Sequence, residues 1–259
     1  MRRLLAAVVL WLAALTAGQV HAGNTWGTDL SDLWWNPGES GWGVNFAHQG
    51  EIIFMTMFVY GADGKAKWYV GSGLASQGGA FTFTGPLFET TGPYFGGNFN
   101  PANAGGRQVG TATIVFQGVD DATLTYGVDG VNVTKSIQRN TFRVNDLSGT
   151  YKGATIGTAA GCGANSGNFS DFAPIVIGQT GSSISIVASI TSTFSCTYSG
   201  TYLQAGRMGS IVGSLSCTNG AHGTFQAIEI EAGYQAFSLR YSADYGGGCT
   251  EVGRIGGLK

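Results

Sequence analysis

Charged side chains are scarce in this chain of 259 residues, at 11% of the total, and the two signs nearly balance. Thirteen Lys and Arg stand against fifteen Asp and Glu, for a formal net charge of −2 at pH 7. Proteins that bind nucleic acid or anionic membranes carry a basic excess, which this composition lacks. The sequence therefore predicts no nucleic-acid partner.

Histidine is also rare, with three residues, and the spacings that mark metal and catalytic sites are missing. There is no H-E-x-x-H, no C-x-x-C, no G-x-S-x-G and no phosphate-binding loop. The sequence thus predicts no metal site, no cofactor and no catalytic residue set. It favours a protein that is not an enzyme, although a glycosidase needs only two carboxylates, so an enzyme stays an open alternative.

Long apolar runs are absent except at the N-terminus, where Leu4 to Ala17 follow Arg2 and Arg3. This pattern, closed by the small residues Val20 and Ala22, is typical of a secretory signal peptide, which we place at 1–22. The run is shorter than the roughly 20 apolar residues of a membrane-spanning helix. We expect a secreted or periplasmic protein with no transmembrane segment after cleavage. The sequence leaves open which of the two compartments it occupies.

Cysteine is missing from the first half of the chain, and four residues occur in the second. An even number in an exported protein predicts two disulfides, with three possible pairings. We favour Cys196–Cys217, which would clamp neighbouring strands, and Cys162–Cys249, which would join the first and last regions of a closed sheet.

Helical spacing of apolar residues is not sustained anywhere, whereas alternation is common. Residues 122–128 alternate apolar and polar side chains, which is typical of a strand with one buried face. Hairpin signals such as Asp129-Gly130 and Asn219-Gly220 separate these runs. Residues 52–60 are apolar almost throughout, which predicts a strand covered on both faces. The fold class expected is all-β, with two antiparallel β-sandwich or barrel-like domains.

A shift in composition near residue 145 suggests where these domains meet. The tryptophans lie before it and the cysteines after it. We therefore predict a Trp-rich β domain at 25–143 and a disulfide-bonded, barrel-like domain at 146–259. An outer-membrane barrel is a weaker alternative, because its strands would be longer and joined by long loops on one side.

The most distinctive stretch runs from Leu33 to Val70 and contains the motif WWNPGESGWG. With the later segment 124–142, it resembles a β module of secreted proteobacterial proteins that is sometimes appended to exported hydrolases. The resemblance covers about residues 30–142 and implies a compartment and a domain type, but no activity. The second half is similar only in general terms to small calycin-like or avidin-like barrels.

Aromatic and amide side chains in this stretch predict a binding face. Flat rings can cover the C–H faces of sugars while amides and carboxylates bond the hydroxyls. The candidate ligand-binding residues are Trp34, Trp35, Asn36, Glu39, Trp42, Asn45, Trp68 and Tyr69. The competing interpretation is that the rings are core and that Glu39 caps the backbone amides of its own turn. For Arg139 we expect a surface salt bridge.

The function predicted from these residues is an exported, non-catalytic binding module for carbohydrate or another envelope or extracellular ligand. A structural or protein-interaction role is the alternative, with specificity in the loop at 89–107, which carries Tyr94 and Phe95. A hydrolase that uses Glu39 with Asp32 or Glu51 is a third, weaker hypothesis.

Overall fold

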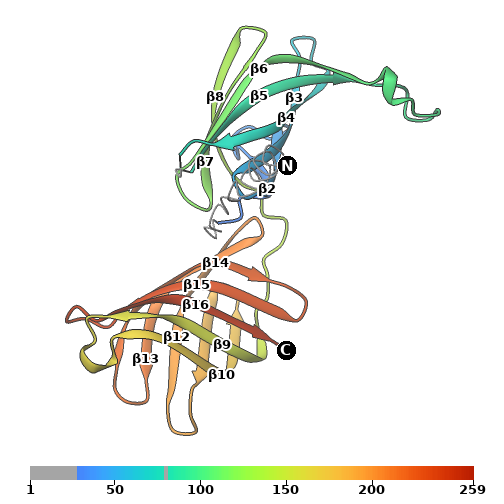
Figure 1. The fold of residues 1–259 in the computed structure, drawn as a ribbon. Coiled ribbons are helices and arrows are strands. Elements are labelled where there is room, and N and C mark those ends of the chain that lie inside the picture. The colour runs from blue at the N-terminus through green and yellow to red at the C-terminus, as the bar shows by residue number, and fades with distance from the viewer. Residues whose placement is uncertain (1–27, 79–80) are drawn as a thin grey trace, which may run out of the picture.

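The protein folds into two closed eight-stranded antiparallel β-barrels, seen in a computed structural model that describes residues 28–78 and 81–259 (Figure 1). In each barrel every strand pairs with the next one along the chain, and the last strand closes on the first. The all-β, two-domain prediction is confirmed. The predicted signal peptide at 1–22 lies outside the described residues.

The strands of the two barrels follow one another in chain order. The first barrel consists of β1 (Asp32–Trp35), β2 (Gly43–Gln49), β3 (Ile52–Tyr60), β4 (Ala66–Ser76), β5 (Thr82–Thr91), β6 (Gly105–Phe116), β7 (Asp121–Val128) and β8 (Val131–Arg139). The second consists of β9 (Gly149–Ala160), β10 (Gly167–Thr180), β11 (Ser183–Ser189), β12 (Ser195–Ala205), β13 (Met208–Cys217), β14 (His222–Ala232), β15 (Ala236–Asp244) and β16 (Thr250–Leu258). The helices η2 (Pro101–Asn103) and η3 (Gly163–Asn165) are single 3-10 turns. No helix within 28–78 and 81–259 is long and apolar enough to cross a membrane.

Local turn chemistry sets the register of these hairpins. Asp129 and Gly130 join β7 to β8 with φ of 47° and 86°. Two successive positive φ angles belong to the type I′ turn, whose twist matches that of the flanking strands. The hairpin predicted at this position is confirmed.

The third strand differs from its prediction, because β3 is covered on one face only. Ile53, Met55 and Met57 are buried, whereas Phe54 and Phe58 are 44% and 47% exposed. A strand in a closed barrel turns alternate side chains into the interior and the others outward. The prediction of cover on both faces is wrong, and its apolar outward residues lie on the surface.

Aromatic rings pack against one another inside the first barrel, among Leu, Ile, Val, Met and Ala side chains. Trp34 is fully buried, with its ring centroid 5.8 Å from that of Phe46 and 5.2 Å from that of Phe116. Phe83 adds an edge contact to Phe116 at 6.0 Å. Tilted and edge-on contacts of this kind pack rings favourably as well as burying their area.

Arg139 completes this core and does not form the surface salt bridge that we expected. It is 2% exposed, lies 4.9 Å from the Trp34 ring centroid and bonds Asp32 Oδ2 at 3.0 Å. It also donates to the carbonyls of Val119 and Asp29, at 2.6 and 2.7 Å. Trp34 and Arg139 are partners in the β1–β8 ladder, so barrel closure brings the guanidinium over the indole. The surface prediction was wrong because it did not include this closure.

Both disulfides lie in the second barrel and join the pairs that the sequence favoured. Cys196 and Cys217 are direct partners in the β12–β13 ladder. Cys162, just after β9, is bonded to Cys249, just before β16. The second bond therefore fastens the first strand of this barrel to its last.

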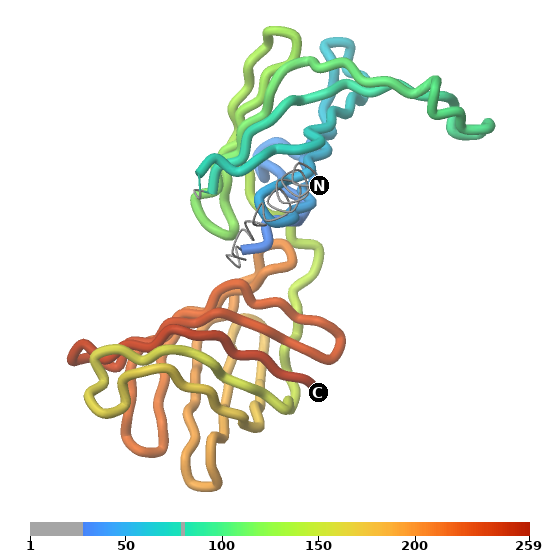
Figure 2. The backbone as a smooth tube through the Cα atoms, in the orientation of Figure 1, coloured from blue at the N-terminus to red at the C-terminus, as the bar shows by residue number. Residues whose placement is uncertain are grey.

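A short segment, 140–148, connects the barrels, and the β12–β13 turn packs beside it (Figure 2). In that turn the Gly206 amide donates to Thr141 Oγ1 at 2.8 Å and the Arg207 amide donates to Asp32 Oδ2 at 2.9 Å. The Arg207 side chain pairs with Asp29. The carboxylate of Asp32 thus links Arg139 of the first barrel to the second barrel.

Candidate functional site

The outer face of the first barrel carries exposed aromatic side chains on neighbouring strands. Phe58 of β3 and Trp68 of β4 are direct ladder partners, and they are 47% and 52% exposed. Tyr60 continues this face at 60% exposure and donates from its hydroxyl to the Gly41 carbonyl at 3.0 Å. Rings of this size are costly to leave in water, so a patch of them indicates a contact surface.

The hairpin formed by β5 and β6 extends this face as an arm that reaches beyond the barrel (Figure 2). Its connecting segment, 92–104, carries Tyr94, Phe95 and Phe99, which are 72%, 92% and 67% exposed. The rings of Tyr94 and Phe95 lie 4.8 Å apart. Near the tip, Asn100 Oδ1 accepts from the Ala102 amide at 3.0 Å and caps the 3-10 turn η2.

An open groove of about 1010 Å³ lies between Trp68 and the arm. Its aromatic lining consists of Trp68, Phe88, Tyr94, Phe95 and Phe99. Ser72 and Thr91, which carry hydroxyl groups, line it as well. None of the described residues that line it is charged. The groove therefore suits a ligand that is neutral, with apolar faces and hydroxyl groups.

The base of the arm is held by ionic contacts across three strands. Glu89 of β5 accepts from Lys67 of β4 at 3.0 Å and from Arg107 of β6 at 2.8 Å, and Arg107 also bonds Asp129 at 2.6 Å. The hydrogen bond from Lys67, followed by that from Arg107, holds the pKa of Glu89 below its usual value. These partners are exposed, so the network adds geometric order more than stability.

The candidate residues of the sequence motif do not form one neighbourhood. Trp34 is fully buried and Tyr69 is 9% exposed, so both belong to the core, while Trp35 and Trp42 are half-buried. Asn45 is exposed on β2. Trp68 is the candidate ring that lies in the groove. Strand alternation separates the cluster into an inner and an outer set.

Glu39 and Asn36 occupy the turn between β1 and β2, with roles that differ from those expected. Glu39 accepts from the Trp42 indole at 2.9 Å and from Lys135 Nζ at 2.8 Å, and the hydrogen bond from Lys135 is the main cause of its lowered pKa. The turn amide of Gly38 is instead bonded by Asn36 Oδ1, at 2.8 Å. The expectation that Glu39 caps its own turn is wrong. These contacts explain the motif as one that orders a turn.

The carboxylates of the hydrolase hypothesis are not brought together. Asp32 begins β1 and is held by Arg139 and Arg207, whereas Glu39 follows the end of β1 and is held by Lys135 and Trp42. Each carboxylate has its own cationic or N–H donor, so neither is free to act as an acid or base with the other.

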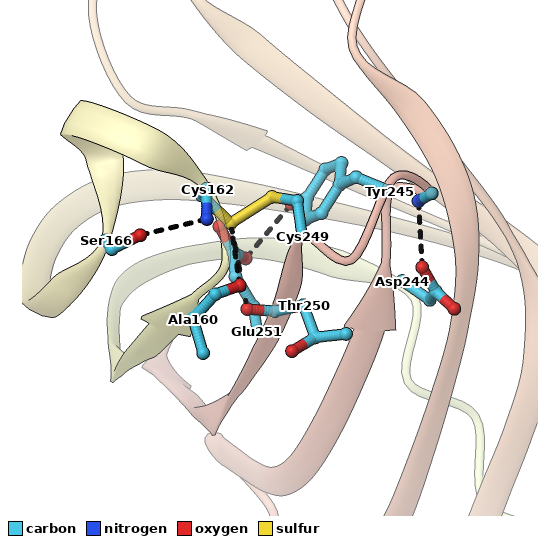
Figure 3. The surroundings of a disulfide bond; sticks show 9 residues. Ala160, Cys162, Ser166, Asp244, Tyr245, Cys249, Thr250 and Glu251 are labelled. Atoms are coloured by element: carbon cyan, nitrogen blue, oxygen red, sulfur yellow. Dashed lines mark hydrogen bonds between the residues drawn. A yellow bond between two sulfur atoms is a disulfide. The ribbon is translucent and has the colours of Figure 1, made fainter.

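The second barrel has a cavity of about 490 Å³ at the end where both disulfides lie. Tyr198, Tyr241, Tyr245, Asp171 and Glu251 line it. Figure 3 shows Tyr245 and Glu251 beside the Cys162–Cys249 disulfide, with the Tyr245 hydroxyl 3.0 Å from Glu251 Oε2. Sequence reasoning did not find this cavity, because its residues are far apart in the chain and fit no motif.

Phe88 and Phe99 of the groove were also missed by sequence reasoning. Phe99 lies in the loop at 89–107 that the sequence analysis named. Phe88 lies in β5, where an aromatic residue of a strand is expected to be buried in the core. A bulge between Leu87 and Phe88 shifts the register there. Leu87 is fully buried, whereas Phe88 lines the outer groove.

No cluster of three or more His, Cys, Asp or Glu that could hold a metal ion occurs in the described part of the chain. Comparison with protein-family models, with curated proteins and with solved structures finds no match for this chain. The argument for function therefore depends on the groove and the cavity themselves.

Proposed function

We propose that this protein is an exported, non-catalytic binding module that holds a neutral carbohydrate chain in the aromatic groove of its first barrel. The observation that carries the proposal is the groove itself, in which exposed rings and hydroxyl groups line an uncharged surface. Export is supported by the two disulfides, because such bonds persist in oxidising compartments.

Carbohydrate fits this lining for chemical reasons. A pyranose presents flat patches of C–H bonds that stack on aromatic faces, and its hydroxyl groups bond neighbouring Ser and Thr. The open shape of the groove suits an extended chain more than a single small molecule. The described lining residues are uncharged, which favours a neutral polymer over an anionic one.

Affinity electrophoresis of the mature protein in gels that contain soluble polysaccharide tests this function. Hydroxyethyl cellulose, soluble xylan and a β-1,3-glucan serve as neutral probes, and alginate serves as the anionic one. We expect retardation by at least one neutral polymer. Loss of one stacking ring removes about 0.5–1.5 kcal/mol of binding, so Trp68→Ala should weaken retention by roughly two- to tenfold.

Tyr234→Ala provides the matched control, because Tyr234 is 95% exposed and lies in the second barrel, outside the groove. Its retention should equal that of the wild type. Equal migration of the wild type in all gels, with and without polymer, would reject carbohydrate binding. Equal retention of Trp68→Ala and the wild type would place binding elsewhere on the molecule.

The arm supports a second candidate function, a protein-interaction role. Phe95 is 92% exposed and Phe99 is 67% exposed on a hairpin that projects from the barrel. Rings presented on a projecting hairpin are suited to insertion into a pocket of a partner protein. Crosslinking from position 95 in envelope extract should yield one defined adduct if this is the function, and a polysaccharide-dependent loss of crosslinking would favour the groove instead.

A further inference from the structure

The geometry at the open end of the second barrel points to a second ligand site: we infer that this cavity binds a small organic cation, an ammonium group on an apolar body. The inference concerns a different barrel from the carbohydrate groove and does not depend on it. Three features carry it, namely the concave shape, the carboxylates without ion-pair partners and the tyrosine rings.

The shape is that of a small-molecule site. The cavity measures about 490 Å³ and opens at one end of a closed eight-stranded barrel. Ligand sites commonly span about 300–1,000 Å³ with mainly apolar walls and a few polar groups, and an eight-stranded barrel is wide enough to hold one small ligand. Phe169, Ile190 and Phe194 supply apolar wall, and both disulfides border the cavity. The rim is thus covalently fixed.

The charge inside this space is one-sided. Asp171 and Glu251 line the cavity, and its described lining contains no Lys or Arg. Neither carboxylate forms an ion pair with another described residue. Burial raises the pKa of Glu251, and the nearby charge of Asp171 acts in the same direction. A cation that enters would supply the opposite charge that the protein does not.

Tyrosine rings surround the carboxylate and favour an organic cation. Tyr198 and Tyr241 are 7% and 5% exposed, with ring centroids 6.4 Å apart. Tyr245 donates its hydroxyl hydrogen to Glu251 Oε2 at 3.0 Å, which fixes the carboxylate beside the rings. Aromatic faces attract ammonium groups, and cages of such rings bind quaternary ammonium ligands.

An inorganic divalent cation fits this lining less well. Calcium requires six to eight oxygen ligands and zinc prefers four nitrogen or sulfur ligands. The cavity offers two carboxylates, and its four cysteines are engaged in disulfides. A bulky cation with weakly held water needs no such ligand shell, because rings and a carboxylate replace its hydration.

Isothermal titration with choline and with 3,3-dimethylbutan-1-ol isolates the role of charge. The two compounds have nearly the same shape, and only choline is charged. Loss of the ammonium–ring and ammonium–carboxylate attraction should weaken binding by about tenfold or more, so choline should bind and the alcohol should bind far more weakly. Benzyltrimethylammonium, with a larger apolar body, should bind more tightly than choline.

Glu251→Gln should reduce choline affinity by about tenfold, because it removes the charge and preserves the size of the side chain. Glu51→Gln is the matched control, since Glu51 is exposed in the first barrel and the same charge is lost. Its affinity should equal that of the wild type. Affinity in the wild type should also rise with pH as Glu251 ionises, and this dependence should disappear in Glu251→Gln.

Two results would overturn the inference. One is equal affinity for choline and the neutral alcohol, which would make the cavity an apolar site without charge selection. The other is no heat and no thermal stabilisation with either ammonium compound at about 10 mM, where even a weak site is occupied. For Glu251→Gln, a melting temperature at or above that of the wild type would show that its lower choline affinity concerns binding and not folding.

Discussion

The two barrels share a strand count and a topology but fill their interiors differently. In the first, Trp34, Phe46, Phe83 and Phe116 pack against one another in the core. In the second, tyrosines line the wall and a cavity remains at one end. An eight-stranded barrel can adopt either arrangement, so side chains and not topology determine where a ligand can enter.

The two barrels also differ in the contacts that join their first strand to their last. The first barrel closes β1 on β8, where the Arg139–Asp32 ion pair lies against the Trp34 ring. The second closes β9 on β16 with a disulfide at the rim of its cavity. Side chains that line a cavity lose part of their van der Waals contacts. The cavity end of the second barrel therefore depends more on its disulfide for stability than the packed core of the first barrel does.

The largest effect expected is loss of the Cys162–Cys249 bond. The two cysteines are 87 residues apart, and the loop-entropy relation gives about 4–5 kcal/mol for a loop of that size. In Cys162→Ser/Cys249→Ser, guanidinium unfolding followed by near-ultraviolet circular dichroism of the tyrosines should shift to a lower midpoint.

Two readouts control this experiment. Cys196→Ser/Cys217→Ser, with a separation of 21 residues, should lose less, about 3 kcal/mol by the same relation. Tryptophan emission should keep its midpoint in both variants, because no tryptophan follows residue 68. A parallel shift of the tryptophan transition would show that the two barrels unfold as one unit.

A comparison of Trp34→Ala with Trp68→Ala tests the division between inner and outer rings. Trp34 is fully buried beneath Arg139, so its truncation should cost about 3–5 kcal/mol of unfolding free energy. Trp68 is 52% exposed and should cost roughly 0.5 kcal/mol. Urea denaturation monitored by circular dichroism measures both. Similar losses in the two variants would mean that Trp68 is part of the core.

The smallest effect expected is that of Glu251→Gln on stability, and it depends on pH. Burial raises the pKa of Glu251 in the folded state, so the folded protein holds this proton more tightly than the unfolded chain. The resulting stability is complete below the unfolded pKa and is lost as pH rises through the raised folded value.

Glu251→Gln should therefore match the wild type in acid and be more stable than the wild type near neutrality. Melting temperatures at several pH values between 4 and 8 measure this difference. A variant that is less stable than the wild type at pH 7 would contradict the assignment of Glu251 as a half-buried carboxylate without an ion-pair partner.

The sequence predicts those features that depend on local pattern. Alternation and turn residues predict two all-β units, and Asp129-Gly130 predicts its hairpin. The cysteine positions predict both disulfide pairings. Each of these features is decided by residues close in the chain or by a small number of pairings.

Local sequence patterns do not predict the features that arise when the first and last strands of a barrel pair. The apolar run of β3 predicts cover on both faces, but a closed barrel leaves Phe54 and Phe58 outside. Arg139 has polar neighbours in sequence, yet pairing of β8 with β1 buries it over Trp34. The cavity around Glu251 combines residues from opposite ends of the second barrel's chain, which no local spacing reveals.

Acrylamide quenching of tryptophan emission tests most directly whether the groove around Trp68 is the binding surface. We predict that the wild type has a readily quenched component, that Trp68→Phe loses most of it, and that a retained neutral polysaccharide protects the wild type alone. Identical quenching of wild type and variant, or equal protection of both by polysaccharide, would contradict this account and place the binding surface away from the groove.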